Sequence, residues 1–107
     1  MIKAVFHLDR KEGTDQSEFE RYWQEDHAPI ASEGVPGLLK YTISFPADVE
    51  SAPFDGMAQL YFEDEAAAEE GLASEAMEEA VADVPNFADP DSVVDVVVEE
   101  HVQVDRT

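Results

Sequence analysis

Alternating apolar and polar residues predict four β-strands in this chain, over residues 2–9, 38–45, 56–63 and 93–104. The first strand shows the pattern most clearly. One side of it carries Ile2, Ala4, Phe6 and Leu8, and the other side carries Lys3, Val5, His7 and Asp9. The last strand differs, because its apolar residues Val94, Val96, Val97 and Val98 occupy both sides. Both sides of that strand are therefore expected to be buried.

A first helix is predicted where apolar residues recur at spacings of three and four. It begins after Thr14 or Asp15, either of which can cap it. The stripe at these spacings contains Phe19, Tyr22, Trp23, Asp26, His27 and Ile30. Because Pro29 disfavours helical geometry at Ala28, the helix is expected to end near His27.

A second helix is predicted from Asp64, which can cap it, to Pro85, which stops it. Its stripe contains Leu72, Ala73, Ala76, Met77, Ala80, Val81 and Val84. Gly71 lies within it and costs about 1 kcal/mol relative to alanine, so this helix needs support from the rest of the fold.

The predicted order is β-α-β-β-α-β in one domain over residues 1–107, which indicates a ferredoxin-like α+β fold with an antiparallel four-stranded sheet. Such a sheet places both helices on one face. Its other face carries Val5, Met57, Tyr61 and the valines of the last strand. A second copy could cover that apolar face, so the pattern predicts a homodimer whose two sheets form an α/β barrel.

The net charge indicates which partners the protein excludes and the salt concentration in which it works. Twenty-six acidic residues face six lysines and arginines, which gives −20. Such a surface repels nucleic acid and anionic membranes, so neither is expected as a partner. The acids are scattered rather than clustered, and 44% of the residues are hydrophobic, which argues against both a cation-binding loop and disorder. The composition is typical of adaptation to molar salt, where the screening length falls to roughly 3 Å.

Several kinds of site are absent from the sequence. There is no cysteine, so disulfides and thiolate chemistry are excluded. The three histidines lack a metal-binding spacing, and there is no glycine-rich phosphate loop, so we expect no metal and no cofactor. No apolar run is long enough to span a membrane and the N-terminus lacks a leader pattern, so a cytoplasmic protein is expected.

Motifs along the whole chain resemble the EthD family of dimeric α/β-barrel proteins. They are Arg10-Lys11, Thr14, Phe19, Tyr22-Trp23, His27-Ala28-Pro29-Ile30-Ala31, Leu39-Lys40-Tyr41, Asn86-Phe87 and Asp89-Pro90. The family is named for a protein of ether degradation, and the activities of its members are scattered. Related members isomerise lactones of aromatic catabolism, or dehydrate and decarboxylate aromatic polyketides, without metal or organic cofactor. The wider superfamily includes haem-degrading and quinone-forming monooxygenases.

His27 is the leading candidate for a catalytic residue. It shares the helical stripe with Phe19 and Trp23, so it is expected to face the sheet, and histidine moves protons near neutrality. A helix C-terminus would favour its protonated form, whereas burial would oppose it. The structural alternative is a helix cap that packs on Trp23.

Tyr41 is predicted to face the helices, where it could orient or protonate a substrate carbonyl beside His27. It could equally be a core residue with a satisfied hydroxyl. Three helical aromatics, Phe19, Tyr22 and Trp23, could line a pocket for an aromatic ligand, although aromatics at this spacing are more often core residues.

Three functions remain open from the sequence. The first is a cofactor-free isomerase, lyase or dehydratase that acts on a small aromatic or lactone-like molecule, with His27 as acid and base. The second is a cofactor-free or haem-related monooxygenase, in which His27 is the one candidate for an axial ligand. The third is a non-enzymatic dimer that binds a small apolar or aromatic ligand.

Overall fold

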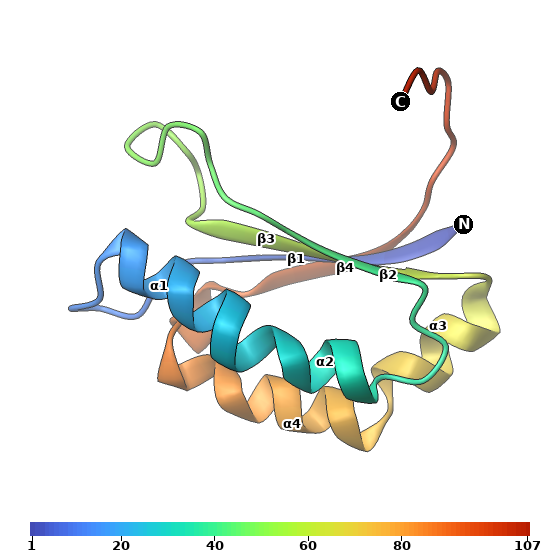
Figure 1. Cartoon of the computed structure of the whole chain (residues 1–107), viewed down its shortest axis with the longest axis horizontal. Helices are drawn as coiled ribbons and strands as arrows, with labels where there is room; N and C mark the ends of the chain where they lie inside the picture. The colour runs from blue at the N-terminus through green and yellow to red at the C-terminus, as the bar shows by residue number, and fades with distance from the viewer.

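Four antiparallel strands form one sheet, and every helix lies on the same side of it (Figure 1). The computed structural model describes residues 1–107, and its strands are β1 (Ile2–Leu8), β2 (Lys40–Ser44), β3 (Gly56–Phe62) and β4 (Val94–Glu99). They lie in the order β2-β3-β1-β4 across the sheet. Helices connect β1 to β2 and β3 to β4, so the predicted ferredoxin-like β-α-β-β-α-β fold of the α+β class is confirmed.

The helix-facing side of the sheet carries the core. Ala4 lies opposite Leu60 in the β1–β3 pair, Ile2 lies opposite Phe62, and all four are buried. Phe19 from the first helix packs among them and is fully buried. The faces predicted from alternation in β1 and β3 are therefore confirmed, since side chains two residues apart share a face.

The first helical region continues past Pro29, so the predicted end near His27 is wrong. The region comprises α1 (Gln16–Tyr22), a π-helical segment η1 (Trp23–His27) and α2 (Ala28–Gly34). Asp15 caps α1 by accepting a hydrogen bond from the Glu18 N–H. In η1 the Ala28 N–H donates to the Trp23 carbonyl, five residues back. This wider turn places Pro29 in the first turn of α2, where a proline is tolerated.

The second helical region is broken, which the single predicted helix did not anticipate. It comprises α3 (Glu65–Leu72) and α4 (Glu75–Asp83). Ser74 causes the break, because its hydroxyl donates to the Gly71 carbonyl and accepts from the Met77 N–H, which starts a new helix. A Cβ at Gly71 would lie 2.5 Å from the Phe62 ring, so glycine permits α3 to approach the sheet closely.

The last strand is shorter than predicted. Two 3₁₀ turns, η2 (Val84–Asn86) and η3 (Pro90–Ser92), precede β4, which ends at Glu99 rather than at residue 104. Its partner β1 begins at Ile2, and the Glu100 N–H makes the final backbone contact with the Met1 carbonyl. The strand ends there because no partner backbone remains beyond it.

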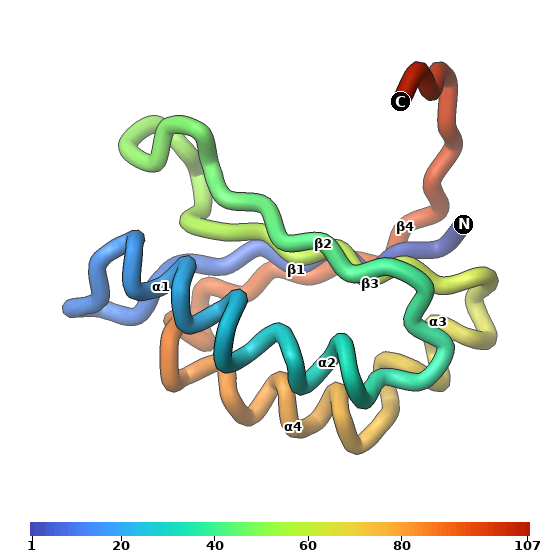
Figure 2. The backbone as a smooth tube through the Cα atoms, in the orientation of Figure 1, coloured from blue at the N-terminus to red at the C-terminus, as the bar shows by residue number.

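The other side of the sheet carries no helix. The loop between β2 and β3 and the C-terminal residues 100–107 both rise on this side (Figure 2). No helix in the structure combines the length and the apolar character needed to cross a membrane.

Candidate functional site

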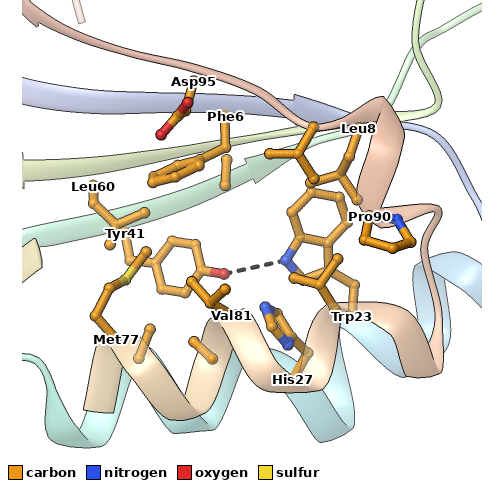
Figure 3. Close-up of a pocket in the computed structure, with 15 residues that line it drawn as sticks. Phe6, Leu8, Trp23, His27, Tyr41, Leu60, Met77, Val81, Pro90 and Asp95 are labelled. Atoms are coloured by element: carbon orange, nitrogen blue, oxygen red, sulfur yellow. Dashed lines mark hydrogen bonds between the residues drawn. The ribbon is translucent and has the colours of Figure 1, made fainter. Parts of the chain in front are cut away.

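A pocket of about 260 Å³ lies between the sheet and the helices (Figure 3). Its lining is mostly aliphatic and aromatic, and its titratable side chains are His27, Tyr41 and Asp95. A dry cavity of about 150 Å³ holds a benzene ring. The pocket therefore has room for one substituted ring.

The π-helical segment places His27 in this pocket, where the residue is 8% exposed. Its Nδ1 lies 2.8 Å from Oδ2 of Asp83, at the end of α4. Figure 3 shows the imidazole pointing into the pocket. Since Asp83 occupies Nδ1, the ring nitrogen left for a ligand is Nε2.

Asp83 is itself held by two further donors. The Tyr22 hydroxyl donates to its Oδ1 at 2.9 Å, and the Asn86 side-chain amide donates to the same oxygen at 2.8 Å. Burial favours the neutral carboxyl, but the hydrogen bonds from Asn86, His27 and Tyr22 outweigh it and lower the pKa of Asp83. Asp83 is therefore ionised at neutral pH and acts only as an acceptor.

The protonation state of His27 follows from these contacts. Burial lowers the pKa of His27 below its ordinary value, although the Asp83 carboxylate acts in the opposite direction. The expected influence of a helix C-terminus is absent, because the helical region continues to Gly34. We therefore expect a neutral His27 at pH 7, with Nδ1–H donating to Asp83 and the lone pair of Nε2 directed to the pocket.

Tyr41 supplies a second polar group in the pocket. The Trp23 indole N–H donates to its hydroxyl oxygen at 3.1 Å. Burial raises the pKa of Tyr41, although the hydrogen bond from Trp23 favours the ionised form. Tyr41 therefore stays protonated, and its own O–H has no acceptor among the protein side chains. That proton can be donated to a bound ligand.

The structure brings three of the five candidate residues together and separates the other two from the pocket. His27, Tyr41 and Trp23 line it. Phe19 is fully buried behind it, and Tyr22 stacks on Phe87 with ring centroids 5.3 Å apart while it holds Asp83.

Sequence reasoning missed two acidic residues. Asp83 lies directly before Val84 and Pro85, and its link to His27 spans 56 residues, which no local pattern reveals. Asp95 could have been found from the sequence, because it is the one charged residue in a run of valines. A charge that interrupts an apolar strand indicates a position with a specific role.

Replacing Asp83 by asparagine is expected to reverse the tautomer of His27. Tyr22 and Asn86 both donate to Oδ1, so the amide oxygen would keep that place and the amide N–H would point at Nδ1. Nδ1 would then accept, the proton would move to Nε2, and Nε2 would no longer offer a lone pair to a ligand. We expect proton transfer to fall by about a hundredfold or more, because a positioned base contributes about 10²–10⁴.

Tyr22→Phe is the matched control, since it removes one hydrogen bond from Asp83 but keeps the carboxylate. Its activity should stay within about tenfold of the parent. Equal losses in Asp83→Asn and Tyr22→Phe, measured as kcat with the fold verified by circular dichroism, would show that the cluster is only structural.

No group of three or more histidine or acidic side chains lies close enough together to hold a metal ion.

The model of the EthD domain matches residues 11–91. An uncharacterised 11.0 kDa protein encoded in the thcB-thcC intergenic region of Rhodococcus erythropolis is 30% identical over 76 residues, which cover 69% of this chain and 73% of the relative.

Solved structures share the fold across almost the whole chain. An EthD-family protein of Bacillus halodurans has a TM-score of 0.77 at 20% identity, with 94% of this chain and 99% of that one covered. A dimeric ferredoxin-like protein of unknown function from Jannaschia has a TM-score of 0.68 at 17% identity, with coverage of 92% and 98%. SnoaB of Streptomyces nogalater, a cofactor-independent oxygenase, has a TM-score of 0.69 at 13% identity, with coverage of 96% and 95%.

Proposed function

The chain belongs to the EthD domain family, and from that premise we propose that it is a cofactor-free enzyme that moves a proton on a small aromatic or lactone-like molecule. The reaction class is isomerisation, elimination or dehydration. His27 is the acid and base, and Tyr41 is the electrophilic partner. The observation that supports this most is the placement of the His27 ring, which is buried in the pocket with Nδ1 held 2.8 Å from Oδ2 of Asp83, so that Nε2 is left for a ligand.

The chemistry starts with removal of a proton from a carbon next to a substrate carbonyl. Nε2 of His27 accepts that proton, and the electron pair of the C–H bond moves toward the carbonyl oxygen. The Tyr41 O–H donates a hydrogen bond to that oxygen, where negative charge develops. The imidazolium that forms is stabilised by the ionised Asp83. It then returns the proton to a different carbon, or to a departing hydroxyl that leaves as water.

The pocket walls favour this chemistry. Phe6, Leu60 and Met77 provide an apolar lining that strengthens electrostatic interactions within it. Trp23 fixes the Tyr41 hydroxyl at 3.1 Å, so the donor is positioned before a ligand arrives. Preorganisation of this kind contributes to catalysis because the groups need not rearrange during the reaction.

Exchange of carbon-bound protons with solvent tests the proposal without knowledge of the natural substrate. Small aryl ketones and muconolactones would be incubated with the protein in deuterated water and followed by proton NMR. Catalysed loss of the signal next to the carbonyl supports the proposal. Slower exchange in Tyr41→Phe would indicate that its hydroxyl stabilises the enolate. Ligand binding without any catalysed exchange would instead favour a dimer that only sequesters its ligand.

A cofactor-independent oxygenase is the second candidate, because the same first step would serve it and SnoaB shares the fold. There the deprotonated aromatic substrate would transfer electrons to dioxygen. Substrate-dependent oxygen uptake in an oxygen electrode distinguishes the two reactions. A haem-related activity fits poorly, since the pocket holds one substituted ring and is smaller than a porphyrin.

A homodimer accounts for the open side of the sheet. On β4, Val94 and Val96 lie opposite His7 and Val5 of β1, on the side away from the helices, and both valines are more than half exposed. Met57 extends this apolar area onto β3. We infer that two copies pack these faces together as a dimeric α/β barrel, because an exposed apolar area of this kind marks a protein interface.

Val96→Asp is expected to convert the dimer into monomers. It would place one carboxylate per chain between Val94 and Val98 on this apolar area, where two copies would bury like charges. Leu39→Asp is the control, because Leu39 is similarly exposed, at 58%, but lies at the other edge of the sheet, before β2. Size-exclusion chromatography with light scattering in concentrated KCl measures the outcome. A dimer that persists in Val96→Asp would contradict this interface.

A further inference from the structure

Asp95 is the single charged residue in the run Val93-Val94-Asp95-Val96-Val97-Val98. It lies opposite Phe6 in the β1–β4 pair, so its side chain is on the helix-facing side of the sheet. There it lines the pocket that contains His27. It makes no hydrogen bond or ion pair with another side chain of the protein. Nothing in the proton-transfer chemistry above uses it.

The position of Asp95 relative to the reacting groups is informative. Figure 3 shows Asp95 on the sheet side of the pocket and His27 on the helix side, with Phe6 and Tyr41 between them. A second hollow along β4 shares Phe6, Met77, Val81 and Asp95 with the first. Asp95 therefore lies where the pocket joins this second hollow. A ring held at His27 and Tyr41 would direct its far substituent toward Asp95.

We propose that Asp95 selects the charge of the ligand, so that the pocket accepts a neutral aromatic carbonyl compound with a ring hydroxyl and rejects carboxylates. This inference rests on the proposed function, because it requires the carbonyl to lie at Tyr41. A hydroxyl at the far end of the ring donates to the Asp95 carboxylate, and hydrogen bonds with one charged partner are roughly twice as strong as neutral ones. A ligand carboxylate at that place meets the like charge of Asp95 at the exposed end of the pocket.

Edge-strand protection is the competing explanation of Asp95. A charge that points inward on an edge strand can prevent unwanted pairing with other chains, and β4 is an edge of this sheet. That role predicts aggregation of the Asp95→Asn protein with no change in ligand preference. Ligand selection predicts a change in preference while the protein keeps its oligomeric state.

Three probes that differ in one substituent separate these explanations. Acetophenone, 4-hydroxyacetophenone and 4-acetylbenzoate would be titrated into the nitrogen-15-labelled protein and its Asp95→Asn variant. Amide chemical shifts then give the affinities, at neutral pH and the lowest salt that keeps the protein folded. Glu99→Gln is the matched control, because Glu99 is on the same strand and side of the sheet but outside the pocket.

The parent protein is expected to bind the hydroxyl compound about tenfold more tightly than acetophenone and the carboxylate at least tenfold more weakly. Asp95→Asn should reduce both ratios to within about threefold, and Glu99→Gln should leave both unchanged. Parent ratios that persist in Asp95→Asn would overturn the role of Asp95 and leave the proposed function intact. Acetophenone binding that is insensitive to both His27→Ala and Tyr41→Phe would overturn the proposed function and this inference together.

Discussion

Replacing His27 by alanine is expected to reduce catalysed proton exchange by about 10²–10⁴-fold, the contribution of a positioned general base. The loss should appear in kcat, because the base acts on the bound substrate. The alanine leaves the Asp83 carboxylate with its donors Tyr22 and Asn86, so that carboxylate stays hydrogen-bonded. The fold and the oligomeric state should therefore persist.

The pH dependence of the proton exchange catalysed by the parent protein should have a definite direction. Burial lowers the pKa of His27 below the ordinary 6.5, so the base stays available from alkaline pH down through pH 6.5. Activity should fall only when the pH drops through the lowered pKa. Between the lowered pKa and pH 6.5, His27 is protonated in the unfolded chain but not in the folded protein. The free energy of unfolding should therefore decrease as the pH falls below 6.5.

His7→Ala is the control for the loss of a histidine. His7 lies on the open side of the sheet, where it stacks on Phe54 with ring centroids 5.0 Å apart, and it does not line the pocket. Exchange activity should survive this change, measured at a protein concentration where the dimer is intact. An active His27→Ala protein would rule out His27 as the base.

Removing salt is expected to unfold the protein, which is the second large effect. A net charge of −20 on 107 residues repels itself strongly at low ionic strength, where the screening length is about 30 Å in 0.01 M salt and about 3 Å in 1 M salt. Few cations offset this charge. Arg21 pairs with Glu18, Glu25 and Asp26, but all four side chains are exposed, and such pairs contribute little.

Circular dichroism melts across a KCl series would measure the effect. The melting temperature should rise steeply from dilute buffer to molar KCl, and the helical signal should be reduced in dilute buffer even at room temperature. Sucrose, which stabilises compact states without screening charge, is the control and should substitute only partly for KCl. A melting temperature independent of KCl would contradict adaptation to molar salt.

The fold could be predicted from the sequence because its determinants are local. The alternation of apolar and polar residues correctly predicted the buried faces of β1 and β3. Asp15 and Asp64 cap the helices as expected. The errors arose where hydrogen bonds or strand pairing that the periodicity does not reveal decide where an element ends. The π-helical turn admits Pro29, Ser74 divides the second helix, and β4 ends because β1 begins at Ile2.

The site could be predicted only in part. His27 and Tyr41 were recognisable from residue type and the predicted face, and the structure places both in one pocket with Trp23. The Asp83 contact was not recognisable, because it depends on how α4 packs against the first helical region. The lowered pKa of His27 depends on that same packing, through burial, and periodicity does not reveal it.

The protonation of the His27 ring tests the proposed chemistry most directly. Long-range proton–nitrogen NMR correlations of the labelled protein at pH 7 would assign the two ring nitrogens of each histidine without a substrate. We expect His27 to be neutral, with the proton on Nδ1 and a bare Nε2 that titrates below pH 6.5. A doubly protonated ring at pH 7, or a proton on Nε2, would contradict the proposed base.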